Sequence, residues 1–316
     1  MLRPGYTGAG VLSVDTSGQR QLISSPGSLR RRRRVWLPAA AAGTTVAAVD
    51  AAFFQPLTST PDGDQTFLAT LACTGPWADT AMHGGPPSAL LVRACERATG
   101  RDDLAALRAS VDFLGPVPVG EVTVSARVIR PGRTVSLSEA TLQAGGRPVL
   151  VARVWSVKLP EPDDDGTPGI KPDDRPVESP QQCPEAMHGA SWDFGYARAV
   201  EWRLLHGDPH GPGMAGVWAR SRIPLVEGEP IGSLGRAVLI ADSGNGVSAS
   251  LDWNRWSFVN VDLTVHLARP VEGEWVLLDA ASRISTTGSG LATSVLRDRA
   301  GVVGAGAQTL VVSARR

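Results

Sequence analysis

An internal repeat limits the possible folds of this chain more than any other feature. A helical pattern followed by strand-like runs begins near residue 49, and the same order returns near residue 223. The Val-Asp pairs at 111–112 and 261–262 are offset by 150 residues and occupy comparable places in the two halves. One helix followed by a meander of antiparallel strands is an α+β pattern. We therefore expect two similar units, each with an antiparallel sheet wrapped around a central helix.

The first half opens with a loop rich in glycine and proline, and a predicted helix follows at 88–99. Leu90 and Leu91 lie on its apolar face, and Pro87 suits a first-turn position. The strand-like runs that follow alternate apolar and polar residues and end at Gly or Pro. They span 109–114, 121–129, 135–143 and 149–157.

The second half has a predicted apolar helix at 231–241, which ends in the stretch Ala-Asp-Ser-Gly-Asn-Gly at 241–246. Four strand-like runs follow it, at 258–267, 274–284, 290–298 and 305–313. The carboxylate of Asp242 would lie at the negative end of the helix dipole, which is mildly unfavourable. An acid in this place is either a solvated helix cap or a group held there for chemistry, and we favour the second reading.

The chain divides into four segments by composition. The segment before residue 49 carries a run of five arginines at 30–34. The segment at 161–191 lacks any apolar period and is rich in Pro and Asp. We interpret the segments as a disordered or mis-started N-terminal extension (1–48), an N-terminal repeat (49–160), a Pro/Asp-rich linker (161–191) and a C-terminal repeat (192–316).

The overall composition excludes several classes of function. The formal net charge is zero, so no global field would recruit nucleic acid or a membrane surface. No segment reaches the roughly 18 apolar residues that a membrane-spanning helix needs. The three cysteines show no metal-binding spacing, and a reducing compartment is the simplest reading. We expect a cytoplasmic protein without metal or other cofactor.

Four stretches resemble the TesB-type (thioesterase II-like) family of double-hotdog acyl-CoA thioesterases. They are 83–91 (HGGPPSALL), 111–118 (VDFLGPVP), 260–267 (NVDLTVHL) and 307–310 (AQTL). The resemblance covers about residues 49–316. It implies a tandem (double) hotdog fold, with two antiparallel sheets that each wrap a central helix. It also implies hydrolysis of a fatty or related acyl-CoA to free acid and CoA, and a homodimer or higher homo-oligomer.

The resemblance assigns three catalytic residues. In the family an Asp, a hydroxyl residue and a Gln position and activate the attacking water, and these places fall here on Asp242, Asn260 and Gln308. Asn260 departs from the family, because its better-known members carry a hydroxyl group there. Each residue also has a structural reading: Asp242 could belong to a left-handed helix stop, Gln308 to an edge strand, and Asn260 to a solvated strand face.

The resemblance and the local sequence indicate five substrate-binding residues. Gly84 and Gly85 could present backbone N–H groups to the oxyanion, because glycine permits close backbone approach. His83 stands beside them and could be a catalytic acid or a structural residue. Trp256 and Phe258 could line or close an apolar acyl pocket between the central helix and the sheet.

Two further functions stay open at this stage. The departure at Asn260 would suit a non-catalytic acyl-CoA or acyl-thioester binding protein of the same fold. Asp79 and His83, four residues apart, would suit a hotdog hydratase or dehydratase. The helix of the first repeat has no carboxylate at the place of Asp242, so we expect one active centre per chain, built on the second repeat and completed by the first.

Overall fold

The computed structural model describes residues 50–159, 176–187, 192–208 and 211–315. The predicted extension at 1–48, its arginine run and much of the predicted linker lie outside these residues. The described elements follow this order along the chain: β1 (Phe54–Ser59), β2 (Gln65–Ala69), η1 (Leu71–Cys73), α1 (Gly85–Thr99), β3 (Ala105–Phe113), β4 (Glu121–Arg130), β5 (Val135–Ala144), β6 (Arg147–Val157), α2 (Gly195–Ala199), β7 (Val200–His206), β8 (Ala215–Ser221), α3 (Ser233–Ala241), α4 (Gly244–Val247), β9 (Trp256–Asn260), β10 (Asp262–Leu267), β11 (Val276–Ile284), β12 (Ser289–Asp298) and β13 (Gly301–Ala314).

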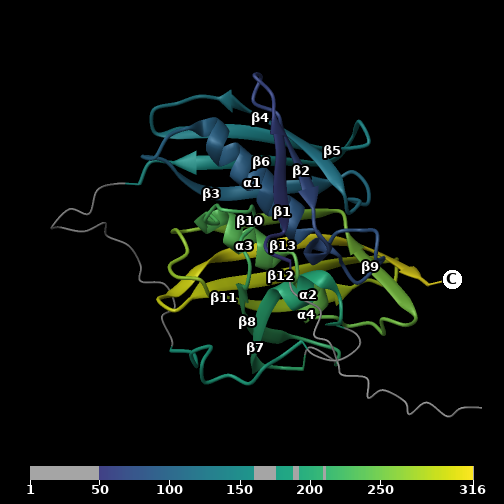
Figure 1. Cartoon of the computed structure of the whole chain (residues 1–316). Coiled ribbons are helices and arrows are strands. Elements are labelled where there is room, and N and C mark those ends of the chain that lie inside the picture. The colour runs from purple at the N-terminus through teal and green to yellow at the C-terminus, as the bar shows by residue number, and fades with distance from the viewer. Residues whose placement is uncertain (1–49, 160–175, 188–191, 209–210, 316) are drawn as a thin grey trace, which may run out of the picture. The chain divides into compact units, whose positions relative to one another are not determined.

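Each half contains one long helix packed on antiparallel strands. Helix α1 packs against β4, β5 and β6, while α3 packs against β10 and β11, and the two helices contact each other. Figure 1 shows both helices in front of the strands, with α1 over the strands of the first half and α3 over those of the second. The core lies between these helices and the strands, and Leu90, Leu91, Leu239 and Ile240 are fully buried in it.

Helix α1 begins three residues before the predicted start. Pro86 and Pro87 occupy its first turn, where the missing N–H group of proline breaks no hydrogen bond. The helix ends at Gly100, which adopts a left-handed conformation with φ of 59°. The early start matters for the site, because it makes Gly84 and Gly85 the entrance of the helix.

The two antiparallel sheets predicted for the two halves are continuous with each other, because their strands join into one 13-stranded sheet. The strand order is β1-β2-β4-β5-β6-β3-β10-β13-β12-β11-β8-β7, and β9 pairs with β13. The join is the antiparallel pair β3–β10, in which Asp112 lies directly opposite Asp262. These two residues are equivalent in the internal repeat. A local two-fold axis therefore passes through the pair that joins the halves.

The run at 258–267, predicted as one strand, is two strands separated by an irregularity. Asn260 in β9 pairs with Leu310, whereas Thr264 in β10 pairs with Ala307, so the register against β13 shifts by one residue. Such a bulge re-aims the side chains that flank it. The inward positions accordingly change from even numbers in β9, such as Phe258, to odd numbers in β10. The shift turns the Asn260 side chain toward the helices.

The segment from α2 to β8 was not predicted, because it leaves little signal in the sequence. Helix α2 has only five residues, and the first five residues of β8 are all buried, so neither shows a clear period. Part of the predicted linker also packs here. Trp218 in β8 donates a hydrogen bond from Nε1 to the carbonyl of Glu178 at 2.9 Å, and Cys183 is buried beside it.

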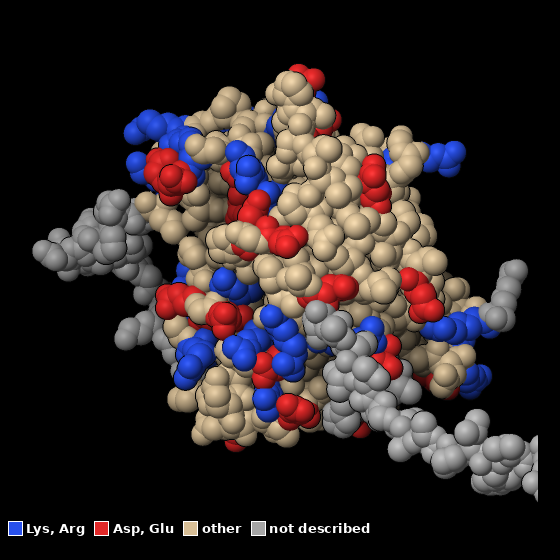
Figure 2. Space-filling model, viewed as in Figure 1, with Lys and Arg blue, Asp and Glu red and all other residues tan. Residues whose placement is uncertain are grey.

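Acidic and basic side chains alternate on the surface. Figure 2 shows red and blue groups next to one another rather than one basic patch on this face. Several of them pair closely, such as Arg93 with Glu229 and Arg220 with Glu201. None of the helices in the described ranges has the length and apolar character needed to cross a bilayer.

Candidate active site

The carboxylate of Asp242 is buried and is held by three side chains. Only 3% of the residue is exposed. Its Oδ1 accepts a hydrogen bond from Asn260 Nδ2 at 2.9 Å and lies 3.5 Å from Gln308 Nε2. Its Oδ2 lies 3.0 Å from His83 Nδ1. The three residues assigned to catalysis thus meet at one point, together with a histidine from the first half.

Asp242 does not belong to a left-handed helix stop. It caps α3 in a right-handed conformation, with φ of −62° and ψ of −18°, and α4 begins two residues later at Gly244. The chain therefore turns from one helix into the next without the αL residue that a Gly or Asn stop would supply. The glycines serve close packing instead: a Cβ at Gly244 would come within 2.9 Å of Gln308 Oε1.

Gln308 fixes the backbone around the acid. Its Nε2 donates to the carbonyl of Asp242 at 3.0 Å, and its Oε1 accepts from the N–H of Asn245 at 3.1 Å. It is 2% exposed and lies in β13, which pairs with β9, β10 and β12. The edge-strand reading of Gln308 is therefore wrong. The amide uses both its donor and its acceptor to bind the link between α3 and α4.

Asn260 faces the acid rather than solvent. Its Nδ2 donates both to Asp242 Oδ1 and, at 3.2 Å, to the carbonyl of Asp262. The bulge between β9 and β10 places it there, so the reading as a solvated face is wrong. The amide does what a hydroxyl could do at this place, because it donates a hydrogen bond to the carboxylate.

His83 contacts the same acid from the loop before α1. Burial lowers the pKa of His83, and the Coulombic attraction of Asp242 partly opposes this shift. The ring is therefore neutral at pH 7 and carries a single proton. Nδ1 lies 3.0 Å from Asp242 Oδ2 and 3.1 Å from the N–H of Gly85, and it cannot donate to the first while accepting from the second. We assign the proton to Nδ1, since a hydrogen bond to a carboxylate is the stronger one.

Tyr196, which sequence reasoning missed, supports His83 from behind. The two rings stack with centroids 3.8 Å apart and planes 9° apart. The Tyr196 hydroxyl donates to the carbonyl of Leu239 at 2.8 Å and accepts from Ser243 at 3.1 Å. Burial raises the pKa of Tyr196, so the phenol stays protonated. Tyr196 lies in α2, a helix too short to leave a sequence signal.

The start of α1 provides backbone donors beside the acid. Pro86 and Pro87 have no N–H, so the donors closest to the acid in this turn are Gly84 and Gly85. Among the described residues no acceptor is recorded for the Gly84 N–H, and Gly84 lines the cavity. A side chain would not fit here: a Cβ at Gly84 would lie 2.8 Å from Asp242 Oδ2, and one at Gly85 would collide with the Leu239 carbonyl.

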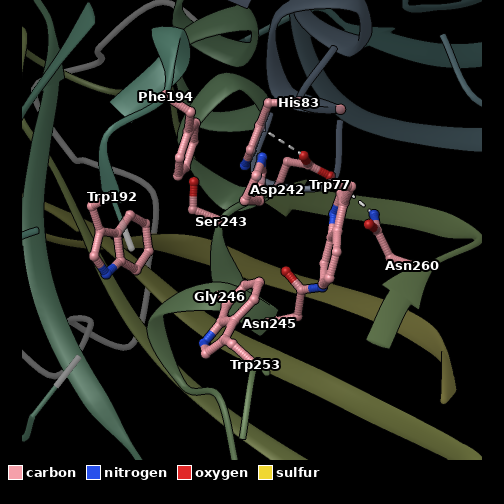
Figure 3. A pocket seen from close by; sticks show the side chains of 12 residues that line it. Trp77, His83, Trp192, Phe194, Asp242, Ser243, Asn245, Gly246, Trp253 and Asn260 are labelled. Atoms are coloured by element: carbon pink, nitrogen blue, oxygen red, sulfur yellow. Dashed lines mark hydrogen bonds and ion pairs between the residues drawn. The ribbon is translucent and has the colours of Figure 1, made fainter. Parts of the chain in front are cut away.

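A cavity opens in front of Asp242, and Figure 3 shows its lining. Aromatic side chains stand on two sides, with Trp192 and Phe194 on one and Trp77 and Trp253 on the other. The full lining is Pro76, Trp77, His83, Gly84, Trp192, Phe194, Asp242, Ser243, Asn245, Gly246, Trp253 and Asn260.

Three residues proposed to bind substrate lie outside this lining. Gly85 stands beside it, with its N–H 3.1 Å from His83 Nδ1. Phe258 is buried behind it, with its ring 4.5 Å from that of Trp253 and 5.5 Å from that of Trp77. Trp256 lies at the start of β9, opposite Ala314, and does not line the cavity. Their role as substrate-binding residues stays a prediction, while His83, Gly84 and the three polar residues all border the cavity or support its acid.

The pair required by a hydratase does not form. Asp79 is exposed and does not line the cavity, whereas His83 contacts Asp242. In the part of the chain that the structure describes, no three His, Cys, Asp or Glu side chains converge as metal ligands would. The arrangement offers a buried acid with a neighbouring neutral imidazole, amide donors and a free backbone N–H. This set can hold and polarise a water molecule beside a carbonyl group.

Comparisons with solved structures support the fold. No curated protein matches the sequence. A protein with a hot dog fold from Alicyclobacillus acidocaldarius is 15% identical with a TM-score of 0.63, over 80% of this chain and 94% of that one. The TesB protein of Mycobacterium avium subspecies paratuberculosis is 16% identical with a TM-score of 0.60, over 81% and 95%. The acyl-CoA thioesterase II TesB2 of Mycobacterium marinum is 15% identical with a TM-score of 0.57, over 82% and 95%.

Family models give the assignment. The model of the acyl-CoA thioesterase N-terminal domain matches residues 73–157, and that of the C-terminal domain matches residues 180–312. Together they cover more than half of the 316 residues and include every residue around the acid. This chain belongs to the TesB-like acyl-CoA thioesterase family.

Proposed function

We propose that this protein hydrolyses acyl-CoA thioesters with a water molecule activated by Asp242. The observation that carries the proposal is the buried Asp242 carboxylate at the edge of a cavity, bound by Asn260, Gln308 and His83. A carboxylate has about four lone-pair sites. The three recorded contacts leave room for one water molecule on the side that faces the cavity.

The chemical steps follow from this placement. The water oxygen attacks the thioester carbonyl carbon while Asp242 takes a proton from the water. The oxyanion forms near the free N–H of Gly84, where the positive end of the α1 dipole also stabilises negative charge. The tetrahedral intermediate then collapses and the carbon–sulfur bond breaks. The proton on Asp242 passes to the leaving thiolate, which yields the free acid and the CoA thiol.

His83 and Tyr196 would act through Asp242 in this scheme. The imidazole donates a hydrogen bond from Nδ1 to Asp242 Oδ2 and so orients the carboxylate. Because the ring is neutral, it does not neutralise the negative charge of the carboxylate. Tyr196 stacks on that ring and keeps it in plane. We regard both as positioning residues, because neither needs to touch the thioester for the reaction to proceed.

We also propose a double hotdog arrangement, with one active centre per chain. Support comes from the local two-fold relation of β3 and β10 and from the source of the site residues. The first half supplies His83 and Gly84, and the second supplies Asp242, Asn260 and Gln308.

A homo-oligomer is also proposed, because strands β9, β12 and β13 expose apolar side chains. Light scattering after gel filtration tests this, and a monomer at every concentration would contradict it.

Release of free thiol from a panel of acyl-CoA substrates tests the proposed reaction. The panel should contain acetyl-, butanoyl-, octanoyl- and hexadecanoyl-CoA, with inactivated protein as the blank. We expect catalytic turnover on at least one member. Saturable binding of acyl-CoA without turnover would instead indicate the non-catalytic binding protein that the Asn260 departure left open.

A further inference from the structure

The cavity beside Asp242 is lined by aromatic rings and lacks the lining that an alkyl chain needs. Among the described residues that border it there is no leucine, isoleucine, valine or methionine. The cavity is also small, about 40 Å³. At about 10–15 Å³ for each water-sized group, this one has room for about three or four non-hydrogen atoms.

Other aromatic residues brace the two indole walls. The ring of Trp253 lies 5.1 Å from that of Trp77 and 4.5 Å from that of Phe258. The ring of Trp192 lies 5.9 Å from Phe194 and 6.3 Å from Trp202, and Trp192 is only 8% exposed. An indole packed on two other rings cannot swing aside without losing both contacts. Movement of either indole would therefore cost these ring contacts.

Gly246 forms the floor between the two indoles. A Cβ at this position would lie 3.6 Å from Cη2 of Trp192 and 3.9 Å from Cζ2 of Trp253. The missing side chain therefore provides the space between the walls, and the indoles set its limit. Asp242, Ser243 and Gly246 all belong to the continuous turn from α3 into α4, so the floor lies close to the acid.

We propose that Trp192, Trp253 and Gly246 restrict the substrate to thioesters of short acyl groups, of about two to four carbon atoms, because the cavity has room for only a few non-hydrogen atoms. The inference rests on the proposed thioesterase function and narrows the fatty-acyl expectation from the sequence. A longer chain would meet the indoles instead of a tunnel between helix and sheet. The bulky CoA moiety would extend through the open side of the cavity to solvent.

The acyl-CoA panel with wild type and two variants tests this inference. Wild type should have a kcat/KM for acetyl- or butanoyl-CoA at least about tenfold above that for octanoyl-CoA. Trp253→Ala removes one wall and should raise the octanoyl-to-acetyl ratio about tenfold or more. Gly246→Ala narrows the floor and should lower the butanoyl-to-acetyl ratio about fivefold or more, since methylene-sized changes have effects of this order.

Gly246→Ala keeps the inference testable if Trp253→Ala fails to fold. The added methyl group makes ordinary van der Waals contacts, and Gly246 lies in a helical segment without positive φ. Gly235→Ala in α3 is the matched control, because its Cβ would lie 3.5 Å from Ile231 and away from the cavity. Thermal unfolding of each variant checks the fold.

The outcomes separate this inference from the proposed function. Octanoyl-CoA hydrolysed by wild type as efficiently as acetyl-CoA would overturn the short-acyl inference and leave the thioesterase proposal standing. A folded Trp253→Ala variant with an unchanged chain-length profile would overturn the role of that indole. No turnover on any acyl-CoA would overturn the thioesterase proposal, and this inference with it.

Discussion

Replacement of Gly84 by alanine perturbs the acid through a single methyl group. The backbone accepts alanine, because Gly84 has φ of −67° and ψ of −20°. The new Cβ would lie 2.6 Å from Cζ of Phe113 and 2.8 Å from Oδ2 of Asp242. Non-bonded carbon atoms prefer about 3.5–4.0 Å, so the Phe113 ring must move by about 1 Å and the carboxylate by about half as much.

Both activity and stability should respond to this strain. A displacement of about 1 Å at a catalytic group can cost about 100-fold, so we expect kcat/KM to fall between about 10- and 100-fold. Overpacking of this kind destabilises by about 1–3 kcal/mol. Thiol release under kcat/KM conditions measures the first effect, and urea unfolding measures the second.

The matched control is Gly235→Ala, where the new Cβ meets only Ile231 at 3.5 Å and the Ala89 carbonyl at 4.0 Å. This variant should keep its activity and gain stability, up to about 1 kcal/mol, because glycine is a poor helix former. A Gly84→Ala enzyme with kcat/KM close to that of wild type would refute the reasoning that Gly84 is required for the placement of Asp242.

Three other changes probe the surroundings of the acid and the helix entrance. Gln308→Leu leaves the Asn245 N–H and the Asp242 carbonyl without their side-chain partner, and urea unfolding should show a loss of about 2–4 kcal/mol. Asn260→Ala removes one donor to the carboxylate and should lower kcat about 10- to 100-fold, whereas an unchanged kcat would show that the contact is dispensable. Burial raises the pKa of Glu96 to about 7, against the opposing effect of Arg93, so the folded state loses stability as the pH rises from about 4.5 to 7. Glu96→Gln should therefore stabilise the protein by about 2–3 kcal/mol at pH 8 and by much less at pH 5, measured by urea unfolding at both values.

The repeat and the three polar site residues could be predicted from the sequence because each leaves a local signal. Residues such as Leu90 and Leu91 mark the helix by their period, and Asp242, Asn260 and Gln308 occupy positions that the family resemblance identifies. The structure brings Asn260 and Gln308 within hydrogen-bonding reach of Asp242.

The rest of the site depends on contacts between distant segments. The stacking of Tyr196 on His83 joins a five-residue helix to a loop more than one hundred residues earlier, and no periodic pattern marks either. The bulge between β9 and β10 was missed because it changes the inward face within one apolar run. The pairing of β3 with β10 joins the two halves into one sheet. The alternation of apolar and polar residues within a strand does not specify which distant strand it pairs with.

The most direct test of the account is the kcat/KM of Asp242→Asn for the best acyl-CoA substrate at pH 7. The amide keeps the size of the side chain and can still accept from Asn260, but it cannot take a proton from water. General base catalysis contributes about 10²- to 10⁴-fold, so we predict a loss within this range in a variant that unfolds near the wild-type temperature. A folded Asp242→Asn enzyme that retains a large share of wild-type kcat/KM would contradict the assignment of Asp242 as the base.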